Sequence, residues 1–281
     1  MRIACLLVAD LPLAAELRAH PELRGAPLAI ASDTGSRAEI LAISPEAARS
    51  GVRPFTTVVH GRAACAELCV RVASPALGRA ARDALLDAAL STSPRVEAAP
   101  PCSGIYATEA AVYVDARGIS SLFHSEAGFA GALIARAEKL GLPAVVAIAS
   151  SRGVAHIAAR KCAGTPGATE VISPGDDAAL LAPLPIDLLN PEGELAESLT
   201  RFGIHRVQDL TRIPESALVT RLGGGARKLL TLARSKESDP PVPTPSRTLF
   251  EESVDLEAPV SHLEPLLFVL RGMISRLVTR L

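Results

Sequence analysis

Three acidic residues stand near the ends of predicted strands, where carboxylates can bind metal ions. Asp10 follows the apolar run at 2–8. Glu109 and Asp115 flank the second arm of a hairpin predicted over 95–115. Phosphoryl transfer by two metal ions needs several carboxylates that converge on cations roughly 4 Å apart. Successive side chains of a strand point to opposite faces, so a displacement of one residue turns a carboxylate away from its partners. These acids are candidate ligands, with capping or a surface role as the default interpretation.

A second group of residues has the chemistry to bind phosphate. It combines open backbone at a predicted helix start with two cations: Gly223, Gly224, Gly225, Arg227 and Lys228. Backbone N–H groups at a helix start form a nest that accepts phosphate oxygens. A flexible loop with solvated charges explains the same residues equally well.

An earlier turn of the same kind, at 189–193, is less suited to phosphate. Pro191 removes a backbone donor, and the carboxylate of Glu192 would repel phosphate. Any DNA binding is therefore expected to be weak and sensitive to salt.

The composition favours a protein of two or three domains, since the chain has 281 residues and 48% hydrophobic residues. A net charge of −1 argues against an autonomous, high-affinity DNA-binding protein. Cys65 and Cys69 are four residues apart, as on one helix face, and are interpreted as core residues rather than metal ligands. Asp10 and Pro12 interrupt the first apolar run too soon for a signal peptide or a membrane span. We expect a cytoplasmic protein without cofactor or metal.

The pattern of apolar residues predicts an α+β fold in the first part of the chain. Predicted strands lie at 2–8, 27–32, 39–44, 68–73, 95–115 (a hairpin), 144–149 and 170–172. Predicted helices lie at 13–20, 45–50, from 57, and at 77–90, 126–140 and 151–162. Together they indicate a helix-backed antiparallel sheet of split βαβ type, with an insertion after its first strand.

The second part of the chain is predicted to be helical from residue 176 onward, with breaks at prolines and glycines. A stiff, proline-rich segment begins at Asp239. A strand at 248–255 and an amphipathic helix at 261–281 follow it.

Several segments resemble the core of Y-family (translesion) DNA polymerases. They are 21–30, 44–53, 112–115 (the family's "AYLD" strand), 149–159, 187–204 and 222–233. The resemblance spans nearly the whole chain. It implies a palm at 1–10 and 75–175, a small fingers insertion at 11–74 and a helical thumb of helix-hairpin-helix type at 176–236. A linker at 237–247 and only the start of a little finger at 248–281 would follow, so we expect a shortened form of a longer protein.

The departures from that family fall at positions that serve catalysis there. The metal-binding acids of the family correspond to Leu7, Ala110 and Ala111, and its nucleotide-binding side chains to Pro12, Pro45 and Ala48. A lysine that neutralises triphosphate in the family has no counterpart at 163–167. Leucine and alanine offer no hard oxygen donor to Mg²⁺. The resemblance therefore implies a degenerate, non-catalytic site.

Such a pattern is similar to the ImuB type of this superfamily. It implies a non-catalytic adaptor of a bacterial SOS mutasome, which acts in error-prone translesion DNA synthesis after DNA damage. Its implied partners are the sliding clamp (through a region outside these residues), an ImuA-type RecA-like protein and an error-prone replicative-type DNA polymerase.

Two alternatives stay open at this point. One is an active Y-family polymerase whose metal ligands are the relocated acids Asp10, Glu109 and Asp115. The other is an unrelated cytosolic α+β enzyme with a small substrate, although the chain has no glycine-rich nucleotide loop, zinc-ligand spacing or nucleophile elbow.

Overall fold

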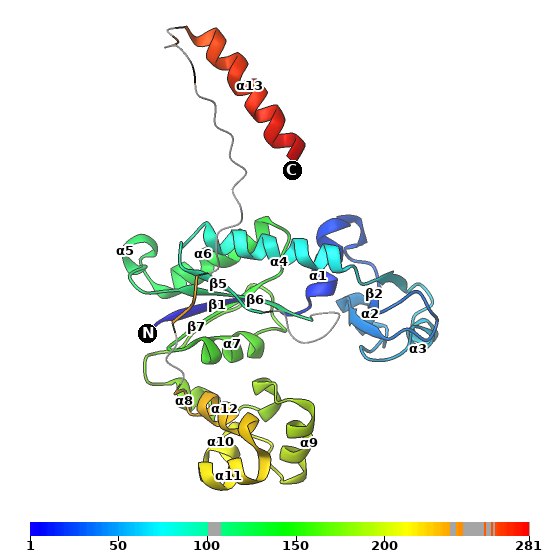
Figure 1. Ribbon diagram of the computed structural model, residues 1–281. Coiled ribbons are helices and arrows are strands. Elements are labelled where there is room, and N and C mark those ends of the chain that lie inside the picture. Colours follow the sequence, from blue (N-terminus) through cyan, green and yellow to red (C-terminus); the bar gives the residue numbers. More distant parts are fainter. Residues whose placement is uncertain (101–107, 237–239, 244–255, 257–259, 261, 281) are drawn as a thin grey trace. The chain divides into compact units, whose positions relative to one another are not determined.

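The computed structural model describes residues 1–100, 108–236, 240–243, 256, 260 and 262–280 (Figure 1). The chain divides into two compact units, Met1–Pro243 and Thr244–Leu281. This division falls within the stretch predicted as a linker, whereas the finer domain boundaries stay predictions. The first unit contains two sheets and a group of small helices, and the second contains one described helix.

The larger sheet has five strands in the order β5-β6-β1-β7-β8. The strands are β1 (Ile3–Val8), β5 (Val96–Ala98), β6 (Ala110–Asp115), β7 (Val145–Ala149) and β8 (Thr169–Val171). The predicted split βαβ arrangement is confirmed, but the sheet is not wholly antiparallel, because β8 pairs in parallel with β7. A helix connects these two strands and carries the chain back across the sheet, so that β8 can run in the same direction as β7.

The central strand β1 is buried on both faces. Ala4, Leu6 and Val8 point into a cluster that α4 (Pro75–Leu90) and α6 (Glu126–Lys139) cover. The intervening Cys5 and Leu7 point into a second cluster on the other face. The continuous apolar run of the sequence is what a strand covered on both sides requires.

The second face of the sheet is covered by α7 (Arg152–Lys161), which begins after the capping residue Ser151. In Figure 1, α7 lies between the sheet and the helical part of the chain. Its apolar residues belong to one cluster that includes residues of both. That part consists of α8 (Asp177–Leu181), η2 (Ile186–Leu189), α9 (Gly193–Arg201), α10 (Val207–Thr211), α11 (Glu215–Leu222) and α12 (Gly224–Ala233). The prediction of a helical second part is confirmed over these residues.

The insertion after β1 carries a smaller sheet of order β3-β2-β4, formed by β2 (Leu28–Ala31), β3 (Ile40–Ile43) and β4 (Cys69–Val72). Its helices are α1 (Leu11–Ala19), η1 (Pro21–Leu23), α2 (Pro45–Arg49) and α3 (Val58–Ala64). The buried carboxylate of Glu16 on α1 accepts a hydrogen bond from Arg71 Nε on β4, at 2.7 Å. This contact ties the smaller sheet to the helix that follows β1.

The two neighbouring cysteines of the insertion do not share a helix face. Since α3 ends at Ala64, Cys65 is its C-cap, and Cys69 begins β4. Cys65 is buried in one apolar cluster, and Cys69 packs against another. The predicted core role is thus confirmed and the shared helix face is wrong.

The second unit contains α13 (Leu263–Arg280). Its apolar residues Leu263, Leu267, Phe268, Leu270 and Ile274 are exposed. The strand predicted at 248–255 lies outside the described residues. Among the helices that the structure describes, none has the length and hydropathy to cross a membrane.

The core under α6 generates a prediction about stability. Leu133 is fully buried in the cluster beneath α4 and α6. We expect Leu133→Ala to lower the free energy of unfolding by roughly 2–5 kcal/mol, because it leaves a cavity that the core fills only in part. Urea unfolding measures the effect. Val59→Ala, at a half-exposed position on α3, serves as the control, and an equal loss in both variants would contradict this assignment of the core.

Candidate functional site at the β1–β6 pair

Three positions singled out by sequence lie side by side on neighbouring strands. In the antiparallel register, Leu7 stands opposite Ala111, and Val8 stands opposite Ala110. Leu7 is 0% exposed, Ala110 6% and Ala111 7%. The structure therefore brings Leu7, Ala110 and Ala111 together, and each is an apolar side chain inside the protein.

These three side chains do not share one surface. Leu7 and Ala111 belong to the cluster beneath α7, whereas Ala110 belongs to the cluster beneath α4 and α6. On the α7 side, their neighbours in the cluster include Val154 and Ala158. Hydrocarbon groups therefore fill this part of the sheet, and an unpaired carboxylate placed there would lose its hydration without compensation.

Glu109, two residues before Ala111, is an acidic side chain close to this part of the sheet. Its carboxylate accepts hydrogen bonds from Arg160 Nε, at 2.9 Å, and from Arg160 Nη2. His156 Nε2 lies 3.0 Å from Oε1, the oxygen that also accepts the bond from Arg160 Nη2. Burial raises the pKa of Glu109, but the bonds to His156 and Arg160 and their charges outweigh this and lower the pKa to about 2. Glu109 is thus a carboxylate already neutralised by a neighbouring cation.

Glu109 is part of a longer row of polar contacts, which we call the α7 polar seam. Arg152, His156 and Arg160 are spaced four residues apart and so lie on one side of α7. Each contacts the β5–β6 hairpin or its approach: Arg152 bonds Glu97 on β5 at 2.7 Å, and His156 Nδ1 lies 2.8 Å from the Tyr113 hydroxyl on β6. The sequence analysis missed the seam, although its four-residue spacing could have suggested it.

A small cavity of about 40 Å³ lies beside the two alanines. Its lining is mostly apolar, and its polar side chains are Arg82, Glu109 and His156. Ligand pockets usually enclose several hundred Å³, so this space suits a water molecule rather than a nucleotide or a metabolite. As far as the described residues show, this cavity is too small to support the alternative of an unrelated α+β enzyme with a small substrate.

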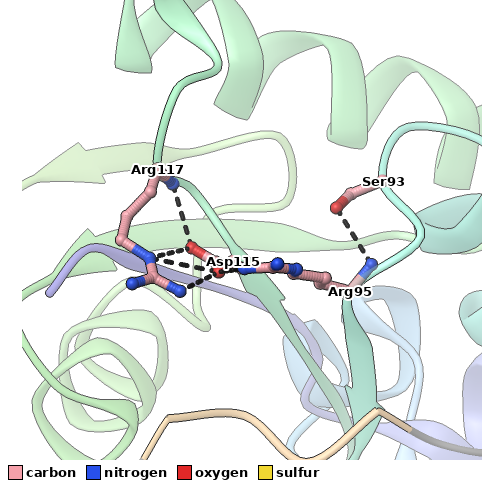
Figure 2. A network of polar contacts seen from close by, with 4 residues as sticks. All are labelled: Ser93, Arg95, Asp115 and Arg117. Carbon is pink, nitrogen blue, oxygen red and sulfur yellow. Dashed lines mark hydrogen bonds and ion pairs between the residues drawn. The ribbon is translucent and has the colours of Figure 1, made fainter.

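Asp115 lies at the far end of the same strand, opposite Ile3. Four residues separate it from Ala111, which is about 13 Å along a strand. Its carboxylate accepts hydrogen bonds from Arg117 Nη2 at 2.6 Å and from the Arg117 backbone N–H at 3.0 Å, with Arg95 Nη1 at 3.4 Å (Figure 2). The Arg117 side chain lowers the pKa of Asp115 to about 2, against the effect of burial.

Asp10 follows β1 and is exposed. The prediction that its side chain caps the next helix is wrong, because no side-chain hydrogen bond forms at that N-cap. Instead, the backbone N–H of Leu11 donates to Thr108 O at 2.9 Å. The backbone contact with the approach to β6 takes the place of a cap.

The three candidate acids thus have separate surroundings, and the structure does not bring Asp115 to Glu109. Within the described ranges, no group of three or more His, Cys, Asp and Glu residues is arranged to hold a metal ion.

The positions singled out for nucleotide binding lie in the insertion and carry no polar side chain. Pro12 is in the first turn of α1, Pro45 begins α2, and Ala48 lies on the exposed side of α2. At the end of α7, Lys161 Nζ bonds Glu170 at 2.6 Å. This lysine is therefore already paired on the protein surface.

The candidate phosphate-binding turn joins α11 to α12. Gly223 has a φ of +76°, a backbone conformation that glycine adopts without strain. Gly224 begins α12, and Gly223, Gly224 and Gly225 are exposed. Arg227 forms an ion pair with Glu215 at 3.1 Å, whereas Lys228 is exposed. One of the two predicted cations is therefore partly compensated.

The two turns of the helical part border one groove of about 620 Å³. Glu192, the N-cap of α9, and Glu194 line it together with Arg221 and Gly225. The two carboxylates of this lining would repel a phosphate backbone. This agrees with the prediction that the first turn is less suited to phosphate.

Comparisons with known proteins agree with this fold. A sequence model of the impB/mucB/samB family matches residues 10–160. Protein ImuB of Caulobacter vibrioides, strain NA1000 / CB15N, is 31% identical over 174 residues, which are 62% of this chain and 35% of that protein. Protein ImuB of a second strain of that species, ATCC 19089 / CIP 103742 / CB 15, matches with the same figures. The aligned region thus spans about a third of the length of these curated relatives.

Solved structures of DNA polymerases have a similar fold. A ternary complex of Dbh has a TM-score of 0.65 and 21% identity, and the match covers 85% of this chain and 68% of that one. DinB from Sulfolobus solfataricus has a TM-score of 0.63 and 22% identity, over 86% and 69% of the two chains. A chimeric Y-family DNA polymerase built on Dbh has a TM-score of 0.65 and 20% identity, over 86% and 70%. The predicted Y-family polymerase core is therefore confirmed as a fold.

The neutralised carboxylate at Glu109 predicts a pH dependence of stability. Its pKa is lower in the folded chain than the ordinary 4.5, so its contribution is present above that pH and is lost as the pH falls toward 2. We expect Glu109→Gln to cost about 3 kcal/mol of unfolding free energy at pH 6, because Arg160 loses its partner. At pH 3 the difference in unfolding free energy between the variant and the unmodified chain should be smaller by about 2 kcal/mol.

Urea unfolding at both pH values measures this difference. Glu67→Gln, at an exposed position, is the control. A difference in unfolding free energy that does not change with pH would contradict the ion pair.

Proposed function

Because the chain belongs to the impB/mucB/samB family, we propose that it is a polymerase-like protein of DNA damage tolerance that does not itself add nucleotides. The observation that carries this proposal is the β1–β6 pair. There, Leu7 and Ala111 stand opposite each other beneath α7 and leave hydrocarbon in place of oxygen donors. Mg²⁺ requires such donors, and the transfer of a nucleotidyl group depends on them.

The surrounding charges support the same proposal. Glu109 is held by Arg160 and His156, and Asp115 is held by Arg117. A carboxylate that served a metal ion would have to release these partners. The side chains of Glu109 and Arg160 are only 12% and 20% exposed, so release of Glu109 would leave a poorly solvated, unpaired cation there.

The proposed role is that of an adaptor in error-prone translesion DNA synthesis, within an SOS-induced mutasome. In this role the polymerase fold occupies the space near the primer-template, and another polymerase performs the synthesis. The proposed partners are the sliding clamp, an ImuA-type RecA-like protein and an error-prone replicative-type DNA polymerase. The curated relatives, both named Protein ImuB, support the coarser role of a polymerase-like protein in DNA damage tolerance, over about a third of their length.

The helical part would contact DNA mainly through its second turn. Gly223 to Gly225 present open backbone at the start of α12, and Lys228 adds a positive charge. The first turn places Glu192 and Glu194 in the shared groove. The expected result is a weak, non-specific interaction with the phosphate backbone.

Primer extension tests the absence of catalysis. We expect the chain to add no nucleotide to a primed DNA template with Mg²⁺ or Mn²⁺, because apolar side chains stand at the three positions where the resemblance places the metal ligands. Gel analysis of a labelled primer measures the product, with an active Y-family polymerase as the positive control. Robust incorporation that persists after repurification, and that Glu109→Gln abolishes, would favour the alternative of relocated ligands.

DNA binding tests the role of the second turn. The logarithm of the binding constant should fall with the logarithm of salt concentration, and Lys228→Gln should reduce that slope by about 1, since one phosphate contact is lost. Glu192→Gln should strengthen binding, because it removes a repulsive charge from the groove. Fluorescence anisotropy with a labelled duplex measures both changes. Lys139→Gln, on the exposed side of α6, is the matched control, and an equal effect there would count against this surface.

A further inference from the structure

Another hollow of the first unit lies at the opposite end of β6 from Ala110 and Ala111. It encloses about 450 Å³ between the turn at 92–95, which leads into β5, and the segment 115–123, which follows β6. That segment ends in α5 (Ser120–Phe123). We call this hollow the Arg95–Arg117 pocket. Its volume is that of a small ligand site, large enough for a few side chains of a peptide.

The charge of this pocket is unbalanced toward positive. Its two guanidinium groups share a single carboxylate, that of Asp115 (Figure 2). Arg117 bonds that carboxylate through both Nε and Nη2, whereas Arg95 reaches it only through Nη1, at 3.4 Å. Among the residues that line the pocket, no other is acidic. Two cations and one anion leave a net charge of +1.

The two arginines are also accessible. The side chain of Arg95 is 66% exposed and that of Arg117 is 53% exposed, while Asp115 is only 7% exposed. Asp115 therefore fixes the two cations from beneath and leaves their outer N–H groups turned to solvent. Ser93 steadies the turn, because its hydroxyl accepts a hydrogen bond from the Arg95 backbone N–H at 3.2 Å.

An apolar wall stands beside these cations. Leu122, a large apolar side chain that lines the hollow, is 75% exposed. Next to it, Phe123 packs edge-on against the fully buried Phe129, with the ring centroids 5.0 Å apart. Phe123 therefore anchors this apolar wall in the core, and Leu122 presents apolar surface to a ligand.

These features favour one kind of occupant. A guanidinium group binds a carboxylate through two parallel hydrogen bonds, and an apolar side chain gains by covering Leu122. A nucleic acid strand would find only two cations there, too few for a backbone of repeated phosphates. We infer that the Arg95–Arg117 pocket binds an acidic peptide segment of a partner protein, in which an Asp or Glu lies next to a large apolar residue. This inference does not rest on the proposed function, since it concerns a surface away from the β1–β6 pair.

Selection from a random peptide library tests the inference with the whole chain as the target. We expect enriched peptides to share an acidic residue within two positions of Leu, Ile or Phe. A synthetic peptide of that consensus should bind about tenfold more weakly to Arg95→Gln, because a charge-assisted bond is lost. It should also bind more weakly to Leu122→Ser. Arg62→Gln, at an exposed arginine of α3, should bind it unchanged.

The controls decide between this inference and its alternatives. Both test positions are well exposed, so circular dichroism and unfolding should show the variants folded. Asn or Gln in place of the acid in the peptide should abolish binding. Enrichment without an acidic residue, no enrichment at all, or binding that Arg95→Gln and Leu122→Ser leave unchanged would overturn the inference. Tighter binding of a single-stranded oligonucleotide than of the consensus peptide, lost in Arg95→Gln, would overturn it in favour of nucleic acid.

Discussion

The pairing of β1 between β6 and β7 is the constraint on which the rest of the first unit depends. Since β1 is covered on both faces, every side chain from Ile3 to Val8 has an assigned neighbour. Ala4, Leu6 and Val8 enter the apolar cluster beneath α4 and α6, whereas Cys5 and Leu7 enter the cluster beneath α7. The second cluster continues into the small helices, so the same strand organises both the sheet and the helical part.

This constraint also explains where charge is allowed. The α7 side of the sheet is apolar at its centre and polar along its β5–β6 edge, where Arg152, His156 and Arg160 meet their partners. At the edge, the guanidinium groups of Arg152 and Arg160 donate hydrogen bonds to Glu97 and Glu109, and the apolar centre stays buried. The seam thereby fixes the orientation of α7, because a rotation of the helix would separate several polar pairs together.

Much of this arrangement could be predicted from local sequence. The apolar run of β1, the serine caps of α2, α4, α6 and α7, and the strand at 112–115 are local signals, and the structure has them. The partners of Glu109 could not be read in this way, since they lie 47 and 51 residues further along the chain. The parallel placement of β8 depends on how α7 packs, and the failed cap at Asp10 depends on the approach of Thr108. Contacts distant in sequence decided each of these cases.

The complete burial of Leu7 has a consequence for how such a chain can change over time. A single mutation to an acid at that position, or at Ala111, would place one charge inside hydrocarbon before any second ligand exists to share an ion with it. Each first step toward a metal centre therefore lowers the population of folded molecules and gives nothing in return. The fold would therefore have to tolerate the first buried acid before a second could share an ion with it.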